Sequence, residues 1–141
     1  PVISSAASDV YKRQAMAYQN AERQAFDESA DPVALIAILF DELLRQMKHF
    51  AREAEVSSGK NLERSEYYSR ALTILYGLQS SLNFEEGGEI ANNLFRLYEY
   101  SRQQLLKTTQ SENSTGLKAA IESLDVIRDA WHQLGAGAKE K

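Results

Sequence analysis

The sequence predicts an all-α protein, an antiparallel up-down four-helix bundle preceded by a short N-terminal helical cap segment. Apolar residues recur every three or four positions along four stretches of helical length. No proline follows Pro32, and most glycines fall between these stretches, where turns are needed. Short turns leave each helix no option but to fold back on the preceding one, which favours the up-down arrangement.

The first predicted helix begins at Pro32, with Asp31 as its N-cap. An N-cap side chain accepts a hydrogen bond from an orphan N–H, and proline presets φ at the first helical position. The other three helices are expected at about 61–83, 89–110 and 115–134. The apolar stripes of the four helices comprise, in chain order, Ile36, Leu39, Phe40, Leu43, Leu44, Met47, Phe50; Tyr68, Ala71, Leu72, Leu75, Leu78, Leu82; Ile90, Leu94, Phe95, Leu97, Tyr98, Leu105, Leu106; and Leu117, Ala120, Ile121, Leu124, Ile127, Trp131, Leu134.

Four parts of the chain follow from this pattern. We expect residues 1–15 to be a disordered extension unrelated to the fold, since Met16 is a candidate initiator methionine. Residues 16–30 have a weaker helical pattern and form the predicted cap segment, with Tyr18, Ala21 and Ala25 on one side. The four-helix bundle is assigned to 31–135, and 136–141 are expected to be a flexible tail.

Composition excludes several classes of function. The 141 residues include 16 Lys and Arg against 20 Asp and Glu, for a formal net charge of −4, and no Cys. Nucleic acid is not expected as a partner, because no basic excess is available to displace condensed counterions. No uncharged stretch reaches the 18 or so residues of a membrane span, and no secretory pattern opens the chain. We therefore expect a cytoplasmic protein without membrane insertion.

Enzyme motifs are incomplete in this sequence. A di-iron bundle needs paired Glu-x-x-His motifs, and the nearest match is Asp129-x-x-His132. Gly87-Gly88 is followed by Glu89, whose charge would repel a phosphate at the helix start. We predict a protein that is not an enzyme and has no catalytic residue, metal or cofactor. A histidine phosphotransfer bundle in a signalling relay, using His49 or His132, is kept as the alternative.

Two helix faces that should be polar lack charge. Leu35 and Ile38 lie away from the main stripe of the first helix, and the second carries an uncharged run from Ala71 to Phe84. Small uncharged residues beside isolated large apolar ones predict a shallow groove that another chain can approach closely. In the competing interpretation, Ile74 and Tyr67 only broaden the core and Gly77 allows close helix packing. The predicted groove residues are Leu35, Ile38, Tyr67, Ile74, Gly77 and Ser81.

The corner between the second and third helices carries a recognisable motif. The stretch LNFEEGGEIANNL at 82–94, followed by LYEY at 97–100, resembles the signature of the FliS family of flagellar secretion chaperones. Further matches lie in order at Ala17-Tyr18, at 29–32 (SADP) leading to Leu39-Phe40-Asp41, and at 129–134 (DAWHQL). The resemblance spans about 16–134, and one departure is Glu42, where the family usually has glycine.

This resemblance implies a partner and a mechanism. A FliS-like bundle binds the C-terminal segment of newly made flagellin in the cytoplasm and keeps it from polymerising early. It then helps to deliver flagellin to the export gate of the flagellar type III secretion apparatus. By the same resemblance, the cap segment around Tyr18 covers part of the binding surface in the free protein and contacts the export gate.

Overall fold

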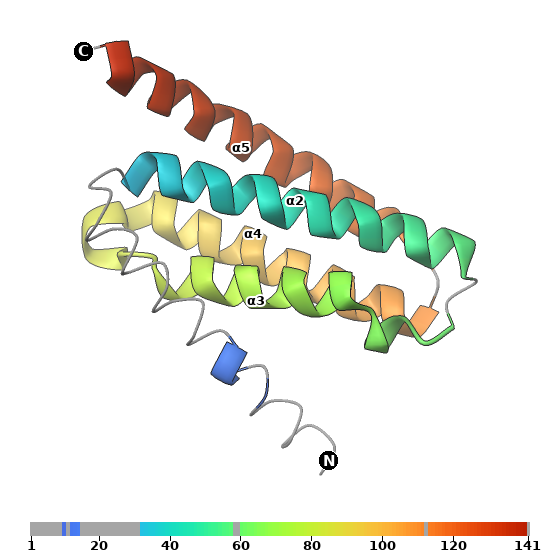
Figure 1. Ribbon diagram of the computed structural model, residues 1–141. Helices are drawn as coiled ribbons and strands as arrows, with labels where there is room; N and C mark the ends of the chain where they lie inside the picture. Colours follow the sequence, from blue (N-terminus) through green and yellow to red (C-terminus); the bar gives the residue numbers. More distant parts are fainter. Residues whose placement is uncertain (1–9, 11, 15–31, 58–59, 112, 141) are drawn as a thin grey trace.

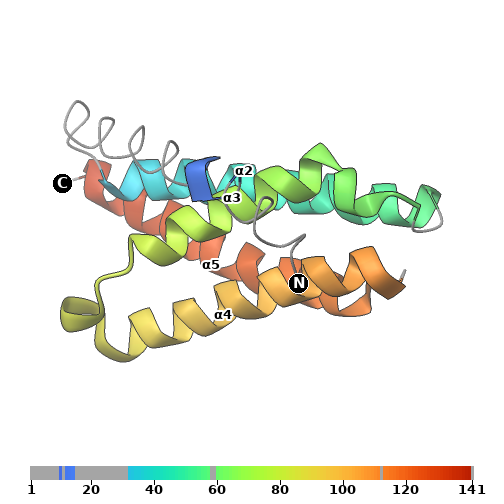
Figure 2. The same cartoon turned by 90° about the horizontal axis from the view of Figure 1, so that it is seen from below.

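The computed structural model describes residues 10, 12–14, 32–57, 60–111 and 113–140, with side chains up to Leu134. Four long helices make up the body: α2 (Pro32–Val56), α3 (Glu66–Ser80), α4 (Phe84–Ser111) and α5 (Thr115–Glu140). A short 3-10 turn, η1 (Leu62–Arg64), precedes α3. The helices run alternately in opposite directions (Figures 1 and 2), and the described residues contain no strand. The predicted all-α antiparallel bundle is confirmed.

The four helices pack as the corners of a square. α2 lies between α3 and α5, and α4 lies between the same two on the other side. α2 and α4 are therefore diagonal partners with little direct contact. Each side of the square is an antiparallel pair, as short up-down connections require.

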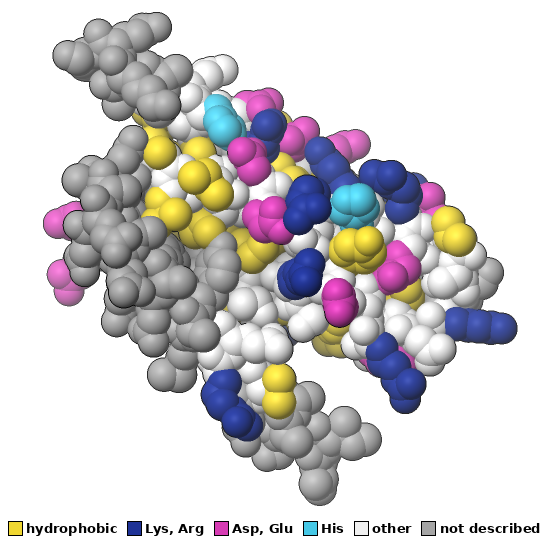
Figure 3. All heavy atoms as spheres, in the orientation of Figure 1, with side chains coloured by type: hydrophobic (Ala, Val, Ile, Leu, Met, Phe, Trp, Pro, Cys, Tyr) yellow, Lys and Arg dark blue, Asp and Glu magenta, His cyan; other side chains and the backbone are white. Residues whose placement is uncertain are grey.

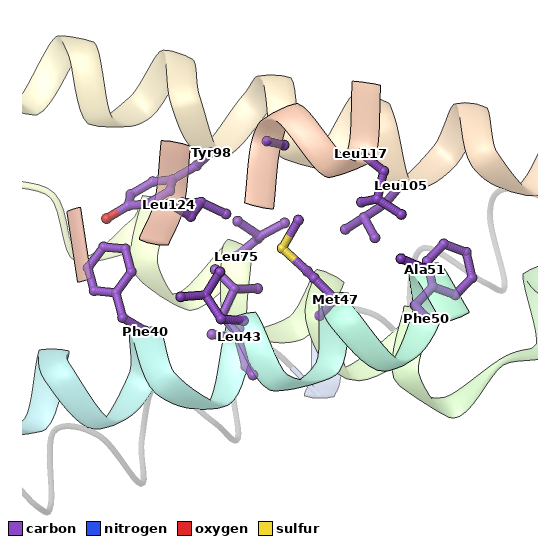
Figure 4. Close-up of a cluster of buried hydrophobic side chains, with 14 of the residues drawn as sticks. Phe40, Leu43, Met47, Phe50, Ala51, Leu75, Tyr98, Leu105, Leu117 and Leu124 are labelled. Carbon is purple, nitrogen blue, oxygen red and sulfur yellow. The ribbon is translucent and has the colours of Figure 1, made fainter. Parts of the chain in front are cut away.

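The core follows the predicted apolar stripes. α2 contributes Phe40, Leu43, Met47 and Phe50, all fully buried, and Figure 4 shows how these side chains meet those of the other helices. Burying one such side chain contributes roughly 1.5–3 kcal/mol. The partners drawn from α3, α4 and α5 include Leu75, Tyr98, Leu105, Leu117 and Leu124.

The second helix is shorter than the predicted 61–83. Asn61 adopts a left-handed conformation (φ 58°), and the chain then forms η1 before α3 begins. Ser65 is the N-cap of α3, and its side chain accepts a hydrogen bond from the backbone N–H of Tyr68 at 3.4 Å. An N-cap serine satisfies an orphan donor of the first turn, which fixes the start of α3 at Glu66.

The third helix begins earlier than the predicted residue 89. The side chain of Asn83 accepts hydrogen bonds from the backbone N–H groups of Glu85 and Glu86, both at 3.1 Å, so a first turn forms from Phe84. Gly88 then interrupts the helix with φ 51° and ψ −126°. This region of φ and ψ is adopted readily only by glycine, and α4 therefore has a kink one turn from its start.

The ends of the chain also differ from the predicted layout. α5 continues to Glu140, so most of the segment expected to be a tail (136–141) is helical. Val10 and residues 12–14, within the expected extension, are helical, and the side chain of Gln14 accepts a hydrogen bond from Thr73 Oγ1 at 3.4 Å. The predicted cap residues Tyr18, Ala21 and Ala25 and the predicted N-cap Asp31 lie outside the described residues.

Candidate functional site

Tyr67 and Ile74, two of the six residues predicted to form a groove, lie on the seam between α2 and α3. Gly77, a third, is buried. The ring of His49 stacks on that of Tyr67, with centroids 4.9 Å apart and planes 16° from parallel. Further along, Glu42 of α2 and Ile74 of α3 line one hollow. Both helices rise about 1.5 Å per residue, so this antiparallel register continues to Leu35, level with Ser81. We call this surface, from Leu35 and Ser81 to His49 and Tyr67, the α2–α3 groove.

The predicted groove residues differ in exposure. Ile38 is 61% exposed, which is unusual for isoleucine, and Ser81 is also exposed. Leu35 and Tyr67 are half-buried. Ile74 is only 3% exposed and packs in the core, although its position in the pattern lies outside the main stripe. It packs there because α3 is covered by both α2 and α4, so Ile74 forms the floor of the groove rather than its surface.

The middle of the groove has an apolar floor and charged edges. A hollow of about 430 Å³ lies over Ile74 and is bordered by Glu42, Ser69, Arg70 and Thr73. Its charges are paired within each helix: Arg45 binds Glu42 at 2.7 Å, and Arg70 lies 3.7 Å from Glu66. The groove therefore presents compensated charge beside apolar surface, which suits a segment that binds mainly through apolar side chains.

Glu42 stands where the family resemblance leads us to expect glycine. Its carboxylate accepts hydrogen bonds from Arg45 and from Gln46 Nε2 (2.7 Å). The hydrogen bond from Arg45 lowers the pKa of Glu42, and burial opposes this change only in part. Gln46 is fully buried, and Glu42 accepts a hydrogen bond from its amide nitrogen, whereas its carbonyl oxygen has no hydrogen-bond partner within the described residues.

A second hollow lies where α3 ends and α4 begins, and we call it the α3–α4 cleft. Its volume is about 400 Å³, and all four helices contribute to its wall. Of the six residues predicted to form a groove, Ser81 is the one that lines this cleft. The apolar lining includes Ile36, Leu78, Leu82, Ile90, Leu94 and Trp131.

The glycine pair of the motif at 82–94 shapes this cleft. A Cβ on Gly87 would lie 2.8 Å from that of Ala91, and Gly88 carries the kink. Ile90, two positions after the kink, is 72% exposed, although its spacing places it in the apolar stripe of the third helix. Figure 3 shows another face, on which hydrophobic side chains gather at the end where α2 begins and charged ones lie over the middle.

The side of α2 that faces α5 carries an ionic cluster. Asp41 Oδ1 accepts a hydrogen bond from Arg128 Nε and lies 2.9 Å from His132 Nε2. Partial burial raises the pKa of Asp41, but the hydrogen bonds from His132 and Arg128 outweigh it and leave that pKa below its ordinary value. The Asp41 carboxylate thus links α2 to α5 and forms a hydrogen bond with Nε2 of His132.

Neither histidine has the surroundings of a phosphotransfer site. His49 is half-buried and lies flat against Tyr67. His132 shares the carboxylate of Asp41, whose charge would repel an incoming phosphoryl group. In the described part of the chain, no group of three or more His, Asp or Glu side chains could hold a metal ion.

Comparison with known proteins gives the family. The family model described as "Flagellar protein FliS" matches residues 14–138. The chain belongs to the FliS family. A "Flagellar secretion chaperone FliS" of Salmonella typhimurium is 31% identical over 126 residues, which cover 86% of this chain and 90% of the relative. The FliS of Vibrio cholerae is 26% identical, covering 84% and 85%, and the FliSB of Pseudomonas aeruginosa is 29% identical, covering 81% and 89%.

The resemblance inferred from the motif at 82–94 is thus confirmed. The family consists of secretion chaperones and not of enzymes, which agrees with the predicted class. None of the helices within the described residues is long and apolar enough to cross a lipid bilayer.

Proposed function

We propose that this FliS-family chain is a cytoplasmic export chaperone that binds the C-terminal segment of flagellin along the α2–α3 groove. It keeps that segment from polymerising early and delivers it to the export gate of the flagellar type III secretion apparatus. The observation that carries the proposal is the exposed Ile38, one helical turn before Glu42 on α2, beside a hollow whose floor is Ile74, on a seam that no ion pair crosses within the described residues. The relatives are flagellar secretion chaperones, which supports the same role.

Reversible binding fits the shape of the groove. A disordered client segment pays its ordering entropy on binding, about 2–5 kcal/mol, so it needs a long apolar contact. The groove supplies such a contact along most of α3 without enclosing the client. The complex can therefore be specific and still be released without nucleotide hydrolysis.

The cap segment is part of the same proposal. Tyr18, Ala21 and Ala25 would cover part of the groove in the free protein and take part in contact with the export gate. Removing a competing intramolecular ligand raises apparent affinity. Deleting residues 1–28 should therefore strengthen flagellin binding, measured by calorimetry. An equal or weaker affinity would remove the cap from the mechanism.

A matched pair of variants tests the groove. Ile38→Lys places a charge on the proposed contact surface, whereas Val126→Lys changes a similarly exposed residue of α5, 68% exposed, away from it. Calorimetry with a peptide of the organism's flagellin C-terminal segment should show binding with a negative heat-capacity change. We expect Ile38→Lys to weaken it about tenfold or more and Val126→Lys to leave it unchanged. No binding at tens of micromolar would contradict the proposed function.

A further inference from the structure

The α3–α4 cleft has the features of a pocket for one anchoring side chain. It is open at its mouth beside the exposed Ile90, and its walls are apolar. Its volume, about 400 Å³, lies at the lower end of the range for pockets that hold small molecules. Trp131 of α5 is half-buried and forms one wall.

A polar group without a partner lies at the bottom of the cleft. Tyr98 is 2% exposed and lines the cleft, and within the described residues its hydroxyl has no hydrogen-bond partner. Its ring is held by Phe40, with centroids 6.2 Å apart, and Figure 4 shows the hydroxyl directed toward the end of the bundle where α4 begins. Burial raises the pKa of Tyr98 well above its ordinary value, so the group is a permanent donor. Within the described residues, the fully buried side-chain atoms that lack a hydrogen-bond partner do not include this oxygen, so water can reach it and a ligand carbonyl can replace that water.

The mouth of the cleft is acidic. Glu85, Glu86 and Glu89 lie within five positions, Glu86 lines the cleft, and none of the three forms an ion pair in the described part of the chain. No Lys or Arg occurs from Ala71 to Phe95. Glu85 and Glu86 also favour the first turn of α4 through the helix dipole, but this leaves the negative field at the mouth uncompensated. The complementary ligand carries a positive charge beside its apolar anchor.

The cleft continues the α2–α3 groove. Ser81 lines the cleft and is also level with Leu35 at the end of the groove. A client chain that lies along the groove toward the C-terminal end of α3 reaches the cleft without leaving apolar surface. The two hollows thus suit one continuous client segment.

We infer that the α3–α4 cleft binds one large apolar side chain of the flagellin segment, with a neighbouring Lys or Arg of the client held by Glu86 and Glu89. The Tyr98 hydroxyl donates a hydrogen bond to a carbonyl of the same stretch. This inference rests on the proposed function and adds a specificity rule to it: the cleft selects a basic residue next to the anchor and rejects an acidic one.

The chain carries a built-in reporter for this test. Trp131 is its only tryptophan, so the intrinsic emission of the protein reports on the wall of the cleft. A Trp-free flagellin C-terminal peptide should shift this emission as it displaces water from the cleft. Replacing the basic residues of the peptide by Gln should weaken binding about fivefold or more, and added salt should reduce the difference between the two peptides.

Three variants of the full chain complete the experiment. Ile90→Lys and Glu86→Lys should each weaken binding of the native peptide about tenfold and abolish the emission shift. Val126→Lys, at a residue of α5 that is about as exposed as Ile90, should change neither. Tyr98→Phe should weaken binding about fivefold, as expected for one hydrogen bond, and circular dichroism checks that each variant folds.

The outcomes separate this inference from the proposed function. Peptide binding with no emission shift, and with equal affinity for wild type and Ile90→Lys, overturns the cleft inference and leaves the groove intact. No binding of either peptide to wild type overturns both.

Discussion

α2 meets its two neighbours in different ways. Against α5, Asp41 pairs with Arg128 and His132, and Glu55 pairs with Lys118. Against α3, no ion pair crosses the seam within the described residues, and the contacts are aromatic stacking and apolar packing. Ion pairs link the two helices of the first seam, and a partner that entered it would have to break them. The second lacks such ion pairs within the described residues, which is the property that the proposed binding surface needs.

The largest expected effect tests whether α2 has two functionally separate sides. Phe40 is fully buried, and Ile38 is 61% exposed. Phe40→Ala should lower the free energy of unfolding by about 3–5 kcal/mol, because it removes a core ring and leaves a cavity. Ile38→Ala should change it by less than about 0.5 kcal/mol. Urea denaturation of both variants measures the contrast, and a large loss for Ile38→Ala would mean that its side chain belongs to the core.

The kink of α4 gives the next largest effect. Gly88→Ala forces a side chain into a conformation that only glycine adopts readily, and should cost about 1–3 kcal/mol. Beyond the adjoining stretch of chain, nothing lies within 4 Å of the added Cβ, so the strain comes from the local backbone conformation. Thermal unfolding measures the cost. If stability is unchanged, residues 84–88 straighten without strain, and the shape of the cleft would have to be reconsidered.

A smaller loss of stability is expected from a substitution on the seam between α2 and α5. Asp41→Asn removes the charge that Arg128 and His132 share, and these side chains are 36–44% exposed, so solvent screens the interaction. The loss of stability should therefore be below about 1 kcal/mol. Flagellin peptide affinity should stay at the wild-type value, because Asp41 faces away from the groove. A loss of affinity would mean that the two seams are coupled.

The smallest effect is on acid stability. The pKa of Asp41 is lower in the folded protein than its ordinary value, so its contribution to stability is present above that ordinary value. It is lost as the pH falls through the lowered folded value. Between pH 7 and about 4, wild type should thus keep its small advantage over Asp41→Asn, and below that range the two denaturation midpoints should converge. A difference that persists in strong acid would assign the effect of the substitution to packing.

The parts of the fold that depend on local spacing were predictable from the sequence. The stripe residues Phe40, Leu43 and Leu75 are buried as the periodicity indicates. Ile74 and Ile90 exchanged their expected environments for reasons that lie elsewhere in the fold. Ile74 is enclosed because α3 has neighbours on two sides, whereas Ile90 lies near the start of α4, beside an open cleft, and is left exposed.

The site was predictable only in part. The groove residues belong to two adjacent helices, so helical geometry could propose them from one helix at a time. The α3–α4 cleft joins Ile36, Leu82, Ile90 and Trp131, which are far apart in the chain and meet only in the folded bundle. The motif at 82–94 pointed to this corner, but a motif alone does not indicate which distant side chains cover it.

Unequal helix length explains where this protein keeps its apolar surface. α3 has 15 residues and α5 has 26, so at about 1.5 Å per residue the two differ by roughly 16 Å. When the helices of a bundle differ so much in length, the shortest helix leaves part of the core uncovered where it ends. Here the shortest of the four long helices is α3, which ends at Ser80, beside the cleft. One or two more turns on α3 would extend over the cleft and remove the anchoring site that we propose there.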